Sequence, residues 1–207
     1  ELKQLMKIIS AKEFSTASLA FEMNNERIRQ IDETVLNIID DVRKNGDAAL
    51  LRFAEKFDRV KLEKLLVTEE EFNEAEKQVS AEFIEAIKIA KENIAAFHKR
   101  QVDNSWIMYK EDGIMLGQKI TPMDRVGIYV PGGKAAYPST VLMNAIPAVI
   151  AQVSEIFIAT PPQADGSINP HVLVAAKIAG ITSIYKMGGA QAVAAYAYGT
   201  ETVKKVD

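Results

Sequence analysis

The 207-residue sequence contains no cysteine. Disulfide bonds, thiolate zinc sites and a thiol nucleophile are therefore excluded within these residues, and a reducing compartment is compatible with the composition. The longest apolar run, Val141–Ala151, is interrupted by Asn144 and Pro147, whereas a membrane-spanning helix needs about 20 apolar residues. Residues 1–9 mix charged and apolar side chains and lack the pattern of a secretory signal. We therefore expect a soluble, cytoplasmic protein with no membrane partner.

Neither sign of charge is in excess, because 25 lysines and arginines stand against 28 aspartates and glutamates, for a net charge of −3. Nucleic acids and anionic membranes attract clustered positive charge, and the sequence has no tract of it. We therefore expect no nucleic-acid partner. Apolar residues make up 48 % of the chain, which suffices for the core of one large domain or two small ones.

The first half of the chain has the apolar spacing of amphipathic helices. Steps of three or four residues place one set of side chains on a single helical face: Ile28, Ile31, Val35, Ile38 and Val42. We expect Gly46 to end this helix and Asp47 to cap a second one that ends near Phe57. Thr68 followed by Glu71 is the pattern of a capping box, which predicts a third helix there.

Ser80 is expected to cap a further helix whose apolar stripe belongs to the core. The stripe consists of Phe83, Ile87, Ala90, Ile94 and Phe97.

His98 lies in the basic last turn of this helix, and His171 lies at the start of a later one. A zinc site needs three or four converging ligands, and neither histidine has such a cluster around it. Both are therefore predicted to be surface residues, and no metal ligand is predicted in this chain.

After Gln101 the pattern changes to short strands that alternate with helices. Strands are expected over 106–109, 114–116, 126–130, 155–159 and 183–187, and helices over 138–152, 170–179 and 190–198. From Val126 onward this alternation predicts a parallel sheet. The expected organisation is an N-terminal arm over 1–27, a helical region with short strands over 28–123, and an α/β unit over 124–207.

Three loops follow the carboxyl ends of the expected parallel strands, where such sheets bind ligands. They are Pro-Gly-Gly-Lys at 131–134, Thr-Pro-Pro-Gln at 160–163 and Gly-Gly-Ala-Gln at 188–191. Glycines let an anion approach backbone N–H groups, Lys134 would add positive charge, and the Gln191 amide can donate and accept hydrogen bonds. The dinucleotide fingerprint G-x-G-x-x-G is absent. The residues alone therefore predict an α/β domain that binds a small molecule, phosphorylated or not.

Several of these segments resemble the histidinol dehydrogenase family. The resemblance rests on residues 126–133, 137–143, 146–148, 160–162, 184–185, 188–192 and 197–200, together with 46–50 in the helical region. It extends over nearly the whole chain, and the first two dozen residues or so match loosely. It implies an α/β fold similar to that of aldehyde dehydrogenases, in which a helical N-terminal region precedes an incomplete Rossmann-like parallel sheet.

The resemblance also implies a function. The family oxidises L-histidinol through L-histidinal to L-histidine, the last two steps of histidine biosynthesis, as a homodimer that uses two NAD and zinc. By the same likeness, Tyr129 and Gln191 correspond to positions that contact NAD. From the residues alone, Tyr129 can equally be a half-buried aromatic and Gln191 a helix cap. The zinc ligands and the Glu-His proton-transfer pair of the family lie beyond Asp207, so no catalytic residue is expected in this chain.

The family is roughly twice as long as this chain, so we expect a cofactor-side portion of the enzyme that is inactive alone. The alternative is a non-catalytic nucleotide-binding or assembly module of the same fold. An aldehyde dehydrogenase relative acting through a thiohemiacetal would need a cysteine, which these residues lack.

One local departure concerns residues 151–153, where the family usually has Ala-Gly-Val and this chain has Ala-Gln-Val. Glycine would suit that helix end better.

Overall fold

The computed structural model describes residues 25–132 and 136–207. The chain divides into two compact units, residues 1–36 and 37–207, and of the first unit residues 25–36 are described, as the first turns of helix α1 (Asn25–Phe53). Gly46 interrupts α1 with non-helical dihedral angles (φ 49°, ψ −130°), so that two helices meet there as predicted. The second helix continues through η2 (Ala54–Asp58).

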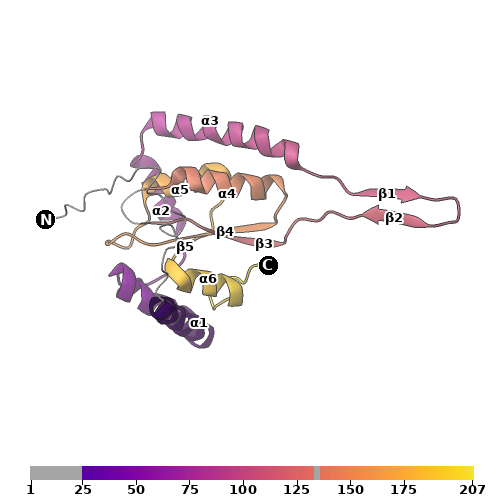
Figure 1. Cartoon of the computed structure of the whole chain (residues 1–207). Coiled ribbons are helices and arrows are strands. Elements are labelled where there is room, and N and C mark those ends of the chain that lie inside the picture. The colour runs from indigo at the N-terminus through magenta and orange to yellow at the C-terminus, as the bar shows by residue number, and fades with distance from the viewer. Residues whose placement is uncertain (1–24, 133–135) are drawn as a thin grey trace, which may run out of the picture. The chain divides into compact units, whose positions relative to one another are not determined.

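A three-stranded parallel sheet lies at the centre of residues 37–207 (Figure 1). Its strands β3 (Arg125–Tyr129), β4 (Glu155–Thr160) and β5 (Ile184–Lys186) are ordered β3-β4-β5. Ile128 of β3 pairs with Ile158 of β4, which in turn pairs with Ile184 of β5. The predicted α/β fold with a parallel sheet is confirmed.

Helices α4 (Pro138–Ile150) and α5 (Pro170–Ala179) cover one face of this sheet. Helix α3 (Ala81–His98) packs on α4 and α5 as an outer layer, and α2 (Glu69–Lys77) packs against α5 (Figure 1). Ile128, Ile158 and Ile184 face these helices in a shared hydrophobic cluster. Because side chains alternate between the two faces of a strand, Phe157 and Tyr185 face the other way.

The opposite face is covered by the later part of α1 and by α6 (Gly189–Tyr198). Val42 and Leu50 of α1 are fully buried there. Tyr196 of α6 packs over Gly127 in β3, so α6 packs on the first strand of the sheet. The division predicted between 28–123 and 124–207 stays a prediction.

Local sequence signals account for several helix ends. The capping box predicted at Thr68 and Glu71 is present, because each side chain bonds the other residue's backbone N–H. The Ser80 hydroxyl accepts the N–H of Phe83, as predicted, and Gly180 ends α5 in a left-handed conformation. Within the described ranges, no helix has the length and apolar character needed to cross a membrane.

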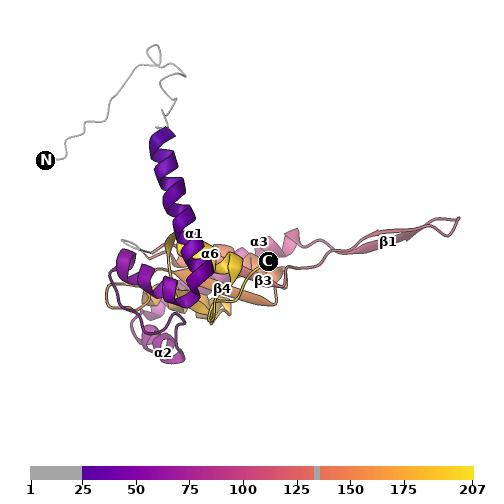
Figure 2. The ribbon, with the colours of Figure 1, turned by 90° about the horizontal axis from the view of Figure 1, so that it is seen from below.

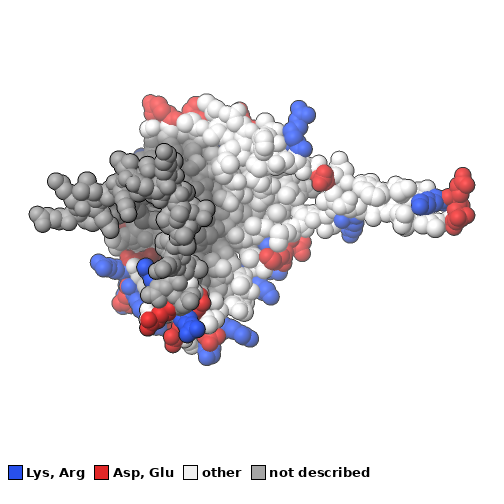
Figure 3. Space-filling view, viewed as in Figure 1, with Lys and Arg blue, Asp and Glu red and all other residues white. Residues whose placement is uncertain are grey.

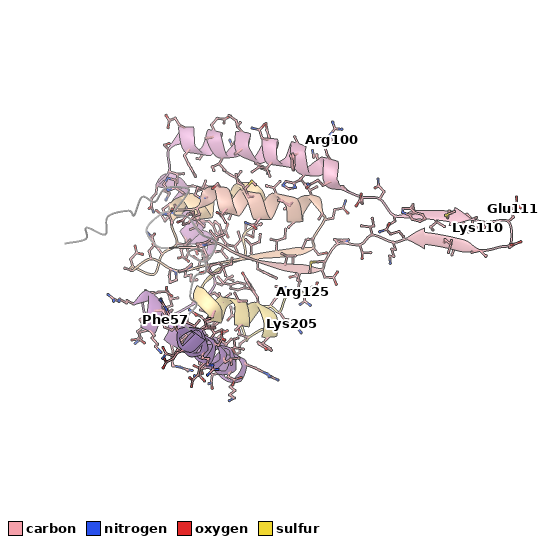
Figure 4. The ribbon with its side chains drawn as sticks, in the orientation of Figure 1. Phe57, Arg100, Lys110, Glu111, Arg125 and Lys205 are labelled. Carbon is pink, nitrogen blue, oxygen red and sulfur yellow. The ribbon has the colours of Figure 1, made fainter. Side chains whose placement is uncertain are left out.

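Beyond α3 and the short η3 (Lys99–Gln101), β1 (Trp106–Tyr109) and β2 (Met115–Gln118) form an antiparallel hairpin. Figures 1 and 2 both show the hairpin extending away from the parallel sheet, and every residue of its strands is exposed. Charged side chains gather at its tip, where Lys110 and Glu111 lie, and the strands between tip and base are uncharged (Figures 3 and 4).

Three predictions about the burial of side chains need correction. Phe97 is 65 % exposed instead of core, because it lies in the last turn of α3 and packs edge-on against His98. His98 is half-buried, and its Nδ1 lies 2.6 Å from Oε1 of Gln101. His171 is also half-buried, with its ring edge-on to Phe83 at 4.5 Å between centroids. Both histidines therefore pack against neighbours and are not plain surface residues.

Asp47 does not cap the second half of α1, contrary to the prediction. Its carboxylate instead accepts three hydrogen bonds from the loop after α6, namely from both threonine hydroxyls at 200 and 202 and from the Thr202 N–H. In return, Glu201 Oε2 accepts the Asp47 N–H at 2.8 Å. The Glu201 carboxylate occupies the space where a Cβ on Gly46 would lie. Asp47 thus ties the α1 kink to residues 200–202.

The end of α4 supports a stability prediction. Gln152 has a left-handed φ of 63°, and Val153 donates to the Ala148 carbonyl at 3.1 Å, which is the geometry that favours glycine after a helix. We expect Gln152→Gly to raise the free energy of unfolding by about 0.5–1 kcal/mol, measured by urea denaturation. Ala151→Gly is the matched control, because Ala151 is right-handed (φ −69°) and glycine there should destabilise. A stabilising Ala151→Gly or a destabilising Gln152→Gly would contradict this account.

Candidate nucleotide-binding crevice

The three glycine- and proline-containing loops predicted to line one crevice meet at Pro161. A Cβ added to Gly132 would lie 3.1 Å from Cδ of Pro161, and one added to Gly188 would lie 2.5 Å from Cγ of the same ring. The first and third loops can therefore approach the second this closely because both positions are glycine. Gly133 and Lys134, which were predicted to contribute to the first loop, lie outside the described residues.

Beside this contact, a cavity of about 450 Å³ opens at the carboxyl ends of β3 and β4. It is lined by Asp58, Pro131, Gly132, Ala136, residues 160–164, Asn169 and Val172. Asn169 also begins α5, because its Oδ1 accepts the His171 N–H at 3.0 Å. The cavity therefore lies between the first turn of α5 and the loops that follow two neighbouring strands.

Tyr129 and Gln191 do not line this cavity. Tyr129 is 38 % exposed, and its Oη accepts the Gly189 N–H at 3.1 Å, which joins the first and third loops. Gln191 is 4 % exposed in the first turn of α6, a helix that begins at Gly188 without a side-chain cap. The structure thus brings Tyr129 to the third loop that carries Gln191, and their contact with NAD stays a prediction.

Asp58 is a cavity residue that the sequence reasoning missed. Its Oδ2 is buried without a hydrogen-bond partner among the described residues, and burial raises the pKa of its carboxyl. Figure 4 places the preceding residue, Phe57, on the side of the sheet where the parallel strands end, opposite Arg125 at the start of β3. Nothing in the helical spacing around Asp58 indicates that this helix end reaches the sheet.

The direction in which the chain crosses the sheet reverses at β3. The helices after β3 and β4 lie on one face, whereas α6 follows β5 onto the other face and packs against β3. The chain then reaches the free side of β3, where the Asp207 N–H donates to the Arg125 carbonyl at 3.2 Å. Open α/β sheets bind ligands at the carboxyl edge beside such a reversal. The fold and crevice therefore define an α/β protein whose parallel sheet carries helices on both faces and a crevice at its carboxyl edge.

A metal site is not formed by the part of the chain that the structure describes. In residues 25–132 and 136–207, no three His, Asp or Glu side chains converge as metal ligands would. Zinc, which the resemblance implies for the intact enzyme, is thus not matched by these residues.

Comparison with known proteins identifies the family. The histidinol dehydrogenase family pattern matches residues 21–207. The chain is 58 % identical over 173 residues to histidinol dehydrogenase of Geobacillus kaustophilus, covering 84 % of this chain and 41 % of that protein. With the Bacillus subtilis enzyme it shares 49 % identity over 202 residues, covering 98 % of this chain and 47 % of that protein. The chain belongs to the histidinol dehydrogenase family.

The fold also matches that of a solved histidinol dehydrogenase structure. The crystal structure of histidinol dehydrogenase from Elizabethkingia anophelis matches with a TM-score of 0.82 at 40 % identity, over 86 % of this chain and 41 % of that chain. The chain thus spans less than half the length of these relatives.

Proposed function

We propose that this chain is the cofactor-side portion of a histidinol dehydrogenase, which oxidises L-histidinol through L-histidinal to L-histidine with two NAD. Family membership supports the reaction, and the crevice at the carboxyl edge of the sheet supports the cofactor site. The observation that carries the proposal is the close contact of Gly132 and Gly188 with Pro161, because it brings the three loops together at the carboxyl edge of the sheet, where a dinucleotide would lie.

In this proposal the chain binds and orients NAD, which accepts hydride when bound. Tyr129 fixes the third loop through its bond to Gly189, and Gln191 supplies an amide from the first turn of α6. Zinc and the proton-transfer pair would come from the remainder of the enzyme.

The 207-residue chain should therefore form no NADH from L-histidinol, even with zinc present. NADH formed in proportion to the purified chain would contradict this prediction.

The intact enzyme is proposed to act in the cytoplasm as a homodimer. The hairpin supports an association of this kind, because Trp106, Ile107, Tyr109 and Met115 are exposed on a two-stranded unit. Isolated two-stranded hairpins are marginally stable in water, and exposed apolar surfaces of this kind are usually covered by another protein segment.

We expect the chain to bind NAD saturably in a calorimetric titration. Gln191→Ala should weaken this binding by about threefold to tenfold, the effect of losing a hydrogen bond worth roughly 1 kcal/mol. Gln78→Ala is the matched control, because Gln78 is an exposed residue at the end of α2, away from the lining of the crevice. Equal affinities for the wild-type chain and Gln191→Ala would remove Gln191 from the site.

A further inference from the structure

One face of the β1–β2 hairpin is more exposed than the other. Side chains alternate along a strand and cross-strand pairs share a face, so Ile107, Tyr109, Met115 and Gly117 lie together on what we call the open face. Tyr109 is 75 % exposed, and Ile107 and Met115 are each 62 % exposed. On the opposite face the most exposed apolar residue of the strands, Trp106, is 50 % exposed. The open face is therefore the one left more accessible to a partner.

A groove of about 290 Å³ lies toward the base of the hairpin, lined by residues 105–107 and 115–119. By strand alternation, Ile107, Met115 and Gly117 of this lining belong to the open face, and Ser105 and Lys119 continue that face past the strand ends. Gly117 has no side chain to fill the groove. Tyr109, nearer the tip, is outside the lining. The open face thus carries both an exposed aromatic ring and a groove that lacks a side chain.

The charged residues of the hairpin lie at its two ends. The tip has an excess of negative charge, from Glu111 and Asp112 beside Lys110, whereas Lys119 follows the base of β2 (Figure 4). The strands between them carry no charge and no proline, which are the residues that usually keep such strands from associating. Two hairpins placed face to face in opposite directions would bring the acidic tip of each onto Lys119 of the other.

We propose that the open face is an interface between two copies of this chain, in which Tyr109 of each hairpin enters the groove at Gly117 of the other. A two-fold contact requires that one surface carry both members of each pair, which the open face does. The same register places Glu111, two residues from Tyr109 toward the tip, over Lys119, two residues from Gly117 toward the base. Shape and charge therefore agree on one arrangement.

The position of the hairpin permits this arrangement. Figures 1 and 2 show the hairpin extending away from the parallel sheet, so two antiparallel hairpins would keep the two sheets at opposite ends. A third or fourth strand segment packed on a two-stranded unit also supplies the stability that an isolated hairpin lacks. The inference rests on the homodimer in the proposed function, for which it names the contact surface.

Sedimentation equilibrium of the 207-residue chain over a range of concentrations tests the proposal. We expect a monomer–dimer equilibrium. Tyr109→Ser should raise the dimer dissociation constant by at least about tenfold, because each dimer loses the buried ring twice. Met108→Ser is the matched control, since Met108 is the neighbouring residue on the opposite face and its change should leave the dissociation constant as it is.

Charge reversal tests the register independently. Lys119→Glu should weaken the dimer by about threefold to tenfold, and adding Glu111→Lys to the same chain should restore the wild-type affinity. Both effects should shrink at high salt, because exposed charge pairs are screened. Circular dichroism checks that every variant keeps the fold of the wild-type chain.

A chain that stays monomeric at all concentrations would overturn the interface. Equal effects of Tyr109→Ser and Met108→Ser, or a dimer that neither variant weakens, would also overturn it, because the contact would then lie on another surface. A Lys119→Glu variant that Glu111→Lys does not rescue would contradict the register. None of these outcomes touches the cofactor site, which the NAD titration tests separately, and failure of that titration would leave the interface standing.

Discussion

Gly127→Ala is expected to lower the free energy of unfolding by about 3 kcal/mol, at the upper end of the usual cost of overpacking a core. A Cβ on Gly127 would lie 2.6 Å from Cδ2 of Tyr196 and 2.8 Å from two further atoms of that ring. Tyr196 is 6 % exposed and lies edge-on to Tyr185, so the ring has little room to move. Urea denaturation followed by circular dichroism measures the loss.

A second background isolates the contact that causes this loss. In Tyr196→Leu the ring is gone, so adding Gly127→Ala should cost clearly less than it does in the wild-type chain. The Tyr196 hydroxyl is itself buried without a partner among the described residues, so shortening this side chain breaks no recorded hydrogen bond there. An equal cost of Gly127→Ala in both backgrounds would mean that backbone conformation, and not the approach of α6 to β3, requires glycine.

Asp47→Ala should destabilise the chain by about 2–4 kcal/mol, because hydrogen bonds to a charged acceptor are individually worth more than neutral ones and several are lost together. Asp47 accepts from Thr200 Oγ1 at 2.5 Å, from the Thr202 N–H at 3.2 Å and from the Thr202 hydroxyl. These bonds hold the loop after α6 on the α1 kink. Chemical denaturation monitored by circular dichroism gives the change.

Asp41→Ala is the matched control for Asp47→Ala, since both carboxylates belong to α1. Asp41 pairs with Arg52 at 2.8 Å, but the Arg52 side chain is 54 % exposed. An ion pair of this kind contributes about 0–1 kcal/mol. If Asp41→Ala cost as much as Asp47→Ala, the bonds to residues 200–202 would not be what stabilises this corner.

Sequence reasoning reached the parts of the fold that depend on near neighbours along the chain. The capping box at Thr68 and Glu71 and the stop at Gly180 each involve residues within one turn, so spacing alone predicts them. The parallel sheet follows from the alternation of strands and helices. The resemblance to the family, rather than spacing, marks Gln152 as a departure at a helix end that favours glycine, and the structure has a left-handed residue there.

Contacts between distant parts of the chain were not accessible in this way. Asp47 looks like a helix cap by its position, but its partners are more than 150 residues away. Asp58 lies in a helical segment, and only folding brings it to the cavity beside Thr160. Spacing also cannot tell that the last turn of α3 leaves Phe97 exposed. Such features depend on tertiary packing, which periodicity does not encode.

Hydrogen–deuterium exchange of the chain with and without saturating NAD tests most directly that the cofactor occupies the crevice. The account predicts slower exchange of backbone amides in the three loops, at residues 129–132, 160–163 and 188–191, while the hairpin residues 106–118 exchange as before. Slower exchange confined to the hairpin, or none in the three loops under saturating NAD, would contradict the placement of the cofactor at the carboxyl edge of the sheet.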